Sequence, residues 1–266
     1  MPRIVCAYVG ENGGMSRARI RWEIVIVLGL SLGASAVYSV VSILAAVTRP
    51  VAIADQSTSV NPQLSEREWL DFVYQFLSHF FDLVPVALAI YLLWLPTQTG
   101  FRRIGLTFEQ PRTDALRGLG LFLAIGIPGI AFFVVCRLLG INLAVEASSL
   151  DGYWWTIPML VFSALRAALS EEVIVVGYLF TRLKQLGWSP WWIIGAAALL
   201  RGTYHLYQGF GPFIGNAVMG VVFGWCYLRW GRVMPLVVAH LLLDVASFVG
   251  YPLAVALWPA VFTTGG

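Results

Sequence analysis

The sequence predicts an all-α protein, built as a polytopic bundle of transmembrane helices. Hydrophobic residues make up 59% of the 266 positions. Charged residues make up 12%, whereas about 25% is usual in a soluble domain. The mean hydropathy is +0.78, and the apolar residues fall into continuous runs that are long enough to cross a bilayer.

The predicted spans are apolar runs of roughly 17 to 25 residues, the length that crosses the hydrocarbon core. We expect about eight of them, at residues 22–47, 69–95, 115–139, 154–186, 190–207, 212–229, 234–249 and 251–263. Glycine and proline at residues 187–190 and 209–212 break the chain between spans. The expected organisation is a cytoplasmic tail at residues 1–21, three N-terminal spans with their loops at 22–150, and a core of spans at 151–266.

The basic residues predict the orientation of the bundle. They gather before the first span and in the second, fourth and sixth loops: Arg17, Arg19 and Arg21; Arg102, Arg103, Arg112 and Arg117; Arg182 and Lys184; Arg229 and Arg232. Because such residues favour the cytoplasmic side, we expect both termini there. The net charge is only +3, and the basic residues lie in loops instead of along one face. This distribution does not support a nucleic-acid partner. We expect an integral, multi-pass protein of a bacterial plasma membrane, with the lipid bilayer as its surroundings.

Two adjacent acids, Glu171 and Glu172, lie inside the predicted span 154–186. An ionised carboxylate in a bilayer is costly unless protein or trapped water receives it, so acids at this depth indicate a functional site. If this span and the next form an antiparallel hairpin, Glu171 and His205 both lie about 23 Å from the turn, at 1.5 Å per residue. They can then face each other, and a carboxylate beside an imidazole suggests an activated water.

Two other polar pairs lie in predicted spans. His240 and Asp244 are four residues apart on one helix face, where they could bind a metal or donate hydrogen bonds to an oxyanion. A simple depth count places His240 too near the turn at Arg232 to meet Glu171, unless a helix is tilted or broken. For His79 and Asp82 we predict a structural role that holds helices together by hydrogen bonds.

Glu172 needs a partner of its own. Adjacent helix residues point about 100° apart, so only one of the two glutamates can face His205 squarely. We expect Glu172 to pair with Arg166 or Arg201, which both lie inside predicted spans.

These residues resemble the CPBP intramembrane proteases, also called CAAX proteases or Abi, bacteriocin-processing proteins. The resemblance covers roughly residues 165–249 and would make residues 151–266 the catalytic core. The family carries Glu-Glu-x-x-x-Arg in one helix, Phe-x-x-x-His in the next, and His-x-x-x-Asn or Asp in a later one. Here the corresponding sequences are EEVIVV at residues 171–176, RGTYH at 201–205 and HLLLD at 240–244.

The resemblance implies an intramembrane endopeptidase that acts on a membrane-associated peptide or protein. Glu171 would be the general base for a water, His205 would assist it, and His240 with Asp244 would stabilise the tetrahedral intermediate. We favour a metal-free mechanism with no cofactor, while zinc stays open. If a metal is bound, Glu171, His205 and His240 would be its ligands.

The chain departs from the family motifs at two positions. Val176 replaces the motif arginine, and Arg201 stands where phenylalanine is expected. We hypothesise that the positive charge has moved, so that Arg201 pairs with Glu172; the alternative is that Arg201 binds only backbone carbonyls. The lost arginine keeps a second function open, a non-catalytic membrane binding or immunity-type protein. A proton-coupled transporter ranks last, because the sequence shows no evident repeat symmetry.

Overall fold

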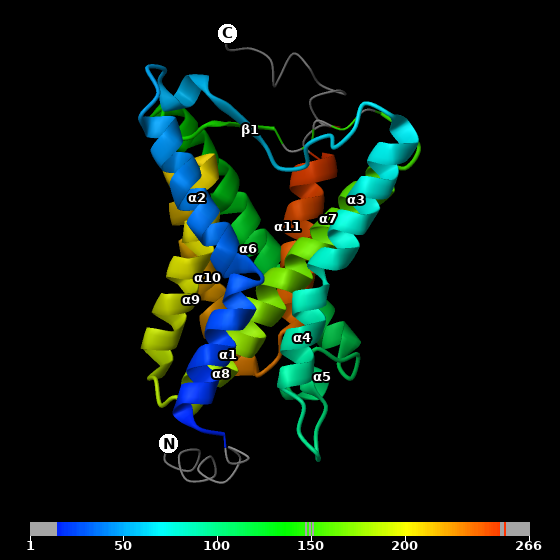
Figure 1. Ribbon diagram of the computed structural model, residues 1–266, viewed down its shortest axis with the longest axis vertical. Helices are drawn as coiled ribbons and strands as arrows, with labels where there is room; N and C mark the ends of the chain where they lie inside the picture. Colours follow the sequence, from blue (N-terminus) through cyan, green and yellow to red (C-terminus); the bar gives the residue numbers. More distant parts are fainter. Residues whose placement is uncertain (1–14, 147, 149, 151, 251–252, 254–266) are drawn as a thin grey trace.

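The computed structural model describes residues 15–146, 148, 150, 152–250 and 253, most of which are helical. Long helices run along the length of the molecule (Figure 1). They are α1 (Arg17–Gly29), α2 (Leu32–Val47), α3 (Glu68–Asp82), α4 (Val84–Leu92), α6 (Pro111–Leu138), α7 (Thr156–Glu171), α8 (Leu179–Gln185), α9 (Pro190–Tyr204), α10 (Phe210–Trp230) and α11 (Met234–Val245), with the single turn α5 (Gly100–Arg103). Two π-helical turns follow α7 and α11, at Glu172–Tyr178 and Ala246–Gly250. The predicted helical class is therefore confirmed.

Two short strands, which the sequence did not predict, lie at the end of the bundle opposite the start of α1 (Figure 1). Strand β1 (Ser57–Ser59) pairs in parallel with β2 (Ala144–Glu146), with Ser57 opposite Ala144. Three-residue strands rarely stand alone, and this pair is supported by the helices that it connects. The segment that leads into β2 also fixes the turn after α9, which lies next to the site.

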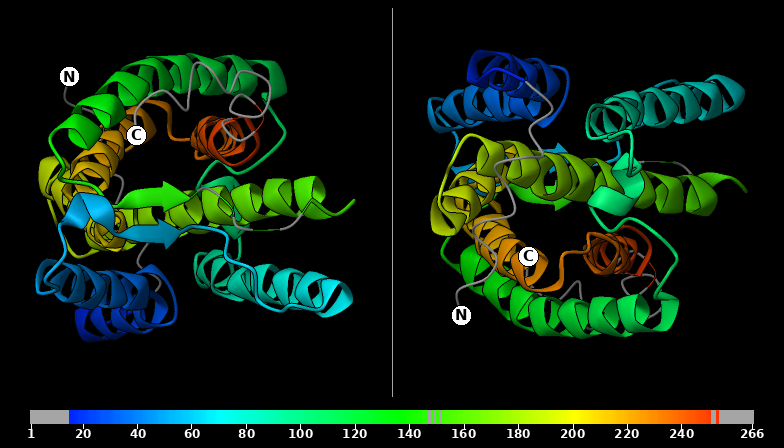
Figure 2. Two further views of the ribbon diagram at one scale, coloured as in Figure 1. Left: turned by 90° about the horizontal axis from the view of Figure 1, so that it is seen from above. Right: turned by 90° about the horizontal axis from the view of Figure 1, so that it is seen from below.

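Helices α7 and α8 form the middle layer of the bundle (Figure 2). Helices α1 to α4 cover one side of this layer, and α6, α10 and α11 cover the other (Figure 2). Helix α9 packs against α10 and α2, while α11 packs against α6 and α7. The π-helical turn is consequently buried on all sides, and Val173, Ile174 and Tyr178 are each 0% exposed. The segment that carries the paired glutamates is thus the centre of the hydrophobic core.

Within the described residues, fewer helices are long and apolar enough to cross a membrane than the eight spans that the sequence predicted. Three helical segments in the described part of the chain are long and apolar enough to cross a membrane: Glu68–Leu92, Pro111–Leu138 and Phe210–Trp230. Helices α1 and α2 would make a fourth if this pair, bent by 56°, is one span. Helix α9 has 15 residues, or about 22 Å at 1.5 Å per residue, and is short for a full crossing. The predicted span 251–263 lies almost entirely outside the described residues.

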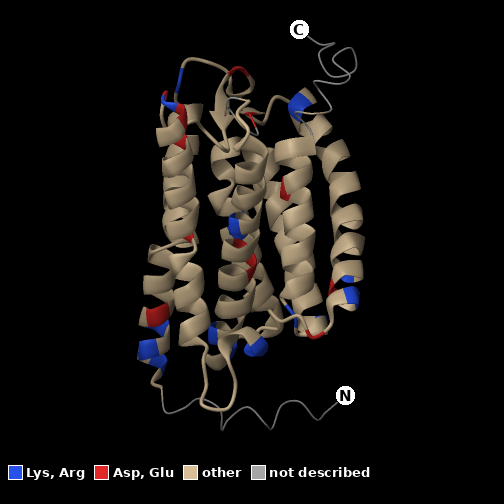
Figure 3. Ribbon diagram, turned by 90° about the vertical axis from the view of Figure 1, so that its right-hand side faces the viewer, with Lys and Arg blue, Asp and Glu red and all other residues tan. Residues whose placement is uncertain are grey.

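Basic residues gather at the end of the bundle where α1 begins (Figure 3). Two of the arginines assigned to loops are nevertheless buried. Arg182, 1% exposed, donates from Nε to Glu23 Oε1 at 2.6 Å and from Nη2 to the Leu92 carbonyl at 2.6 Å. Arg232 donates to both carboxylate oxygens of Asp114, at 2.9 and 2.6 Å, and these bonds raise its pKa. These two arginines tie helices together, in addition to any effect on orientation.

Candidate active site

The two glutamates lie where α7 passes into the π-helical turn. Glu171 is the last residue of α7, and Glu172 is the first of the turn. In a π-helical turn each N–H bonds to the carbonyl five residues earlier, so the turn is wider than in an α-helix and alters the direction of its side chains. Single π-helical turns recur at functional sites. Both carboxylates are buried, with Glu171 7% and Glu172 0% exposed, and they share partners on α9 and α11.

Arg201 of α9 lies between the two carboxylates. Its Nη2 contacts Glu172 Oε1 in a very short ion pair and Glu171 Oε2 at 3.1 Å, and its Nε lies 3.3 Å from Glu171 Oε2. The guanidinium also lies over the ring of Phe223, 5.2 Å from the centroid. Among the described residues Arg201 donates to no backbone carbonyl, so the structure supports the predicted pairing with Glu172. Arg166, the other candidate, pairs with Asp82 at 3.8 Å.

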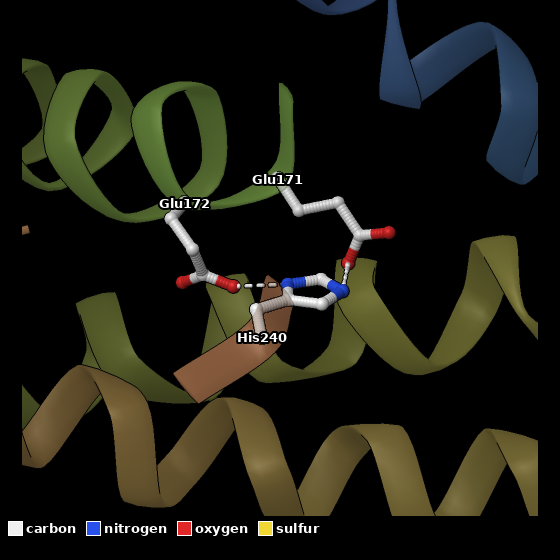
Figure 4. Close-up of side chains that lie close together, drawn as sticks. All are labelled: Glu171, Glu172 and His240. Atoms are coloured by element: carbon white, nitrogen blue, oxygen red, sulfur yellow. Dashed lines mark hydrogen bonds and ion pairs between the residues drawn. The ribbon is translucent and has the colours of Figure 1, made fainter. Parts of the chain in front are cut away.

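His240 of α11 joins the same cluster. Its Nδ1 lies 2.8 Å from Glu172 Oε1, and its Nε2 lies 3.4 Å from Asp244 Oδ2 and 4.0 Å from Glu171 Oε2. Figure 4 shows the imidazole ring between the two carboxylates. The simple depth count allowed this contact only with a tilted or broken helix, and the structure brings the two side chains within 4.0 Å. Helix α11 follows a junction whose backbone is hydrogen-bonded to the loop after α5, through Val233 N to the Ile104 carbonyl at 2.9 Å.

His205 lies at the end of α9, beside Glu171. Its Nε2 is 3.7 Å from Glu171 Oε1, and its side chain is 19% exposed. The helix ends here because a three-residue 3-10 turn and Gly209, with φ +116°, follow. The turn is fixed from two sides, since Tyr207 N donates to Ser39 Oγ at 2.6 Å and the segment before β2 bonds to it through Leu143 N. The predicted proximity of Glu171 and His205 is present, without a direct hydrogen bond.

Tyr204 is a member of the cluster that the sequence reasoning missed. Its hydroxyl donates to Glu171 Oε2 at 2.7 Å, and it accepts from Arg201 Nε at 3.4 Å. Tyr204 is 5% exposed. The signal was available in the sequence, because Tyr204 follows Arg201 by three residues and so shares its helix face.

Three residues of the cluster lie close enough together to be considered as metal ligands. Glu171, Glu172 and His240 can each offer one ligand atom, with these atoms within 4.8 Å of one another. This set differs from the predicted one, because Glu172 takes the place of His205. The Arg201 guanidinium contacts all three residues, and it lies 3.3 Å from His240 Nδ1. Since a cation already balances the two carboxylates there, the residues as arranged do not fit a metal ion.

The second predicted pair, His79 and Asp82, connects α3 to α7. The His79 ring packs edge-on against Phe162, with centroids 5.7 Å apart, and Asp82 forms the ion pair with Arg166. Both partners come from α7. These contacts agree with a structural role, which stays a prediction.

Residues 153–246 match the family model described as type II CAAX prenyl endopeptidase Rce1-like. Searches of curated proteins and of solved structures gave no match. The matched segment contains every residue of the buried cluster, and the apolar helices agree with an integral membrane protein. Over residues 153–246, the chain is therefore similar to the CPBP or CAAX-type family of intramembrane proteases.

Proposed function

We propose that this protein is an intramembrane endopeptidase that hydrolyses a peptide bond of a membrane-associated protein or peptide. The observation that carries the proposal is the Glu171 carboxylate, which is buried and held on one oxygen by Arg201 and Tyr204 while its other oxygen faces His205. A positioned carboxylate of this kind can take a proton from water, and an adjacent imidazole can orient that water.

The proposed reaction begins with a water between Glu171 and the substrate. Glu171 takes one proton of the water, whose oxygen forms a bond to the carbonyl carbon while the carbonyl electron pair moves onto oxygen. His240, whose Nδ1 is held by Glu172 and whose Nε2 lies beside Asp244, donates a hydrogen bond from Nε2 to that oxyanion. When the C–N bond breaks, the electron pair stays on nitrogen, and the proton from Glu171 passes to the leaving amine. Glu172 and Arg201 keep His240 and Glu171 in place.

We propose that this mechanism needs no metal. Arg201 supplies the positive charge between Glu171 and Glu172, so a metal would have to displace a guanidinium that is 0% exposed. Removing a buried charge from its partners is costly. Zinc that copurifies and is lost in His240→Ala would overturn this part of the proposal.

We further propose that both termini are cytoplasmic and that the protein lies in a bacterial plasma membrane. The support for the N-terminus is the gathering of basic residues at the end where α1 begins (Figure 3), which the positive-inside rule assigns to the cytoplasm. A cytoplasmic C-terminus further requires the predicted span 251–263 to return the chain to that side. The name of the matched family suggests a prenylated peptide with a CAAX-type C-terminus as the first substrate to try.

The test is cleavage of a panel of membrane-anchored peptides, with and without a prenylated cysteine near the C-terminus. Wild type should cleave at least one peptide, and Glu171→Gln should not. Glu23→Gln is the matched control, because it also removes a carboxylate from a buried arginine, outside the cluster. Cleavage that survives Glu171→Gln would refute the proposal. Peptide binding without any cleavage by wild type would favour the non-catalytic binding protein instead.

A further inference from the structure

The two oxygens of the Glu171 carboxylate have different surroundings. Oε2 accepts hydrogen bonds from the Tyr204 hydroxyl at 2.7 Å, from Arg201 Nη2 at 3.1 Å and from Arg201 Nε at 3.3 Å. Each carboxylate oxygen offers about two lone-pair sites, so Oε2 has no capacity left. Oε1 accepts no hydrogen bond from the described residues, and His205 Nε2 lies 3.7 Å from it.

The residues near Oε1 are also more exposed than the residues that hold Oε2. Arg201 and Tyr204, which hold Oε2, are 0% and 5% exposed. The side chain of His205, which lies near Oε1, is 19% exposed. In Figure 4 one oxygen of Glu171 contacts His240, and the other points away from His240 and Glu172. The side of the carboxylate at Oε1 is therefore the more exposed one.

We propose that Tyr204 is a positioning residue, which holds Oε2 of Glu171 and thereby makes Oε1 the oxygen that takes the proton from water. The inference rests on the proposed function of Glu171 and adds which oxygen reacts and what selects it. Tyr204 acts through Glu171, because its hydroxyl donates to Oε2 and not to Oε1, the oxygen near His205.

The pair of Arg201 and Tyr204 acts as one clamp. Both residues lie on the same face of α9, three positions apart, and Arg201 Nε also donates to the Tyr204 hydroxyl at 3.4 Å. The hydroxyl thus accepts a hydrogen bond from the guanidinium and donates one to the carboxylate. Without it, Oε2 keeps only the guanidinium, and the carboxylate can rotate so that either oxygen faces His205.

The test compares Tyr204→Phe with Tyr178→Phe on a peptide that wild type cleaves. The control is closely matched, because Tyr178 is 0% exposed and its hydroxyl also donates to a carboxylate, Glu23 Oε1, at 3.0 Å. Both variants lose one buried hydroxyl and should show similar losses of thermal stability. For Tyr204→Phe we expect a kcat that is roughly 10 to 100 times lower with KM within about twofold, since one hydrogen bond to a charged group is lost.

The pH profile separates positioning from a merely structural role. Loss of a donor to the carboxylate favours its neutral form, so the acidic side of the Tyr204→Phe activity profile should move up by about one to two pH units. The Tyr178→Phe profile should match that of wild type. An unshifted profile for Tyr204→Phe, together with an inactive Glu171→Gln, would overturn this inference and leave the proposed function intact. Full activity of Glu171→Gln would remove both.

Discussion

Arg201→Leu tests the idea that the motif arginine has been replaced from a neighbouring helix. Arg201 is 0% exposed and contacts the carboxylates of Glu171 and Glu172. Removing one partner of a buried ion pair costs about 3–5 kcal/mol, because the other charge is left uncompensated. At about 2–4 °C per kcal/mol for a chain of this size, the melting temperature should fall by about 6 to 20 °C.

The informative comparison is the double variant Arg201→Leu with Val176→Arg. Val176 follows Glu172 by four residues and is 2% exposed, so an arginine there starts within reach of the same carboxylate. If the charge has moved from one helix to the other, the double variant should be more stable than Arg201→Leu and should recover part of the cleavage activity. The assay is thermal unfolding in one detergent, followed by the peptide panel.

Arg182→Leu is the control for this experiment. Arg182 is 1% exposed and forms a comparable ion pair with Glu23 instead of with Glu171 or Glu172. It should lower the melting temperature to a similar degree, and Val176→Arg should not restore it. A double variant no more stable than Arg201→Leu, when Val176→Arg alone folds, would refute the relocation.

Three further predictions concern His240, the turn after α9 and the metal. Asp244→Ala should lower kcat by roughly 10²-fold or more, because His240 loses a hydrogen-bonding partner. Asp244→Asn keeps a hydrogen-bonding group, and its kcat should stay within about tenfold of wild type. Equal losses of kcat for the two variants in a steady-state assay would contradict this role. Gly209→Ala should lower the free energy of unfolding by about 1–3 kcal/mol, because φ is +116° and the new Cβ would lie 2.7 Å from Asn142 Cα. Gly187→Ala is the control: φ is +86° there, but the space around the new Cβ is open, so the loss should be smaller. Treatment with a chelator should leave peptide cleavage unchanged, and a loss restored by added zinc would count against the metal-free mechanism.

The positions of the helices could be predicted because bilayer-length apolar runs are a strong signal. The helical segments lie close to the expected ranges for residues 22 to 249. The number of complete spans was harder to predict from the sequence. Hydropathy does not show that α1 and α2 are bent by 56° relative to each other, or that α9 has 15 residues. Burial of Arg182 and Arg232 was also hidden, since the partners Glu23 and Asp114 are distant in sequence.

The composition of the candidate site was predictable, and its detailed geometry was not. Residue types and spacing brought Glu171 and His205 together, whereas His240 needed a tilted or broken helix. Charge alone left both Arg166 and Arg201 as partners for Glu172. The π-helical turn at Glu172 leaves no clear pattern in a run of apolar residues. It is nevertheless this turn that lets two adjacent glutamates share partners, where an α-helix would separate them by about 100°.

The central claim is that Glu171 activates the water that hydrolyses the peptide, and the single-turnover cleavage rate of Glu171→Gln tests it most directly. Glutamine keeps the shape and the hydrogen bond from Tyr204 but cannot take a proton at neutral pH. We predict a rate about 10²- to 10⁴-fold below wild type, with a melting temperature close to that of the Glu23→Gln control. A rate within tenfold of wild type would contradict it.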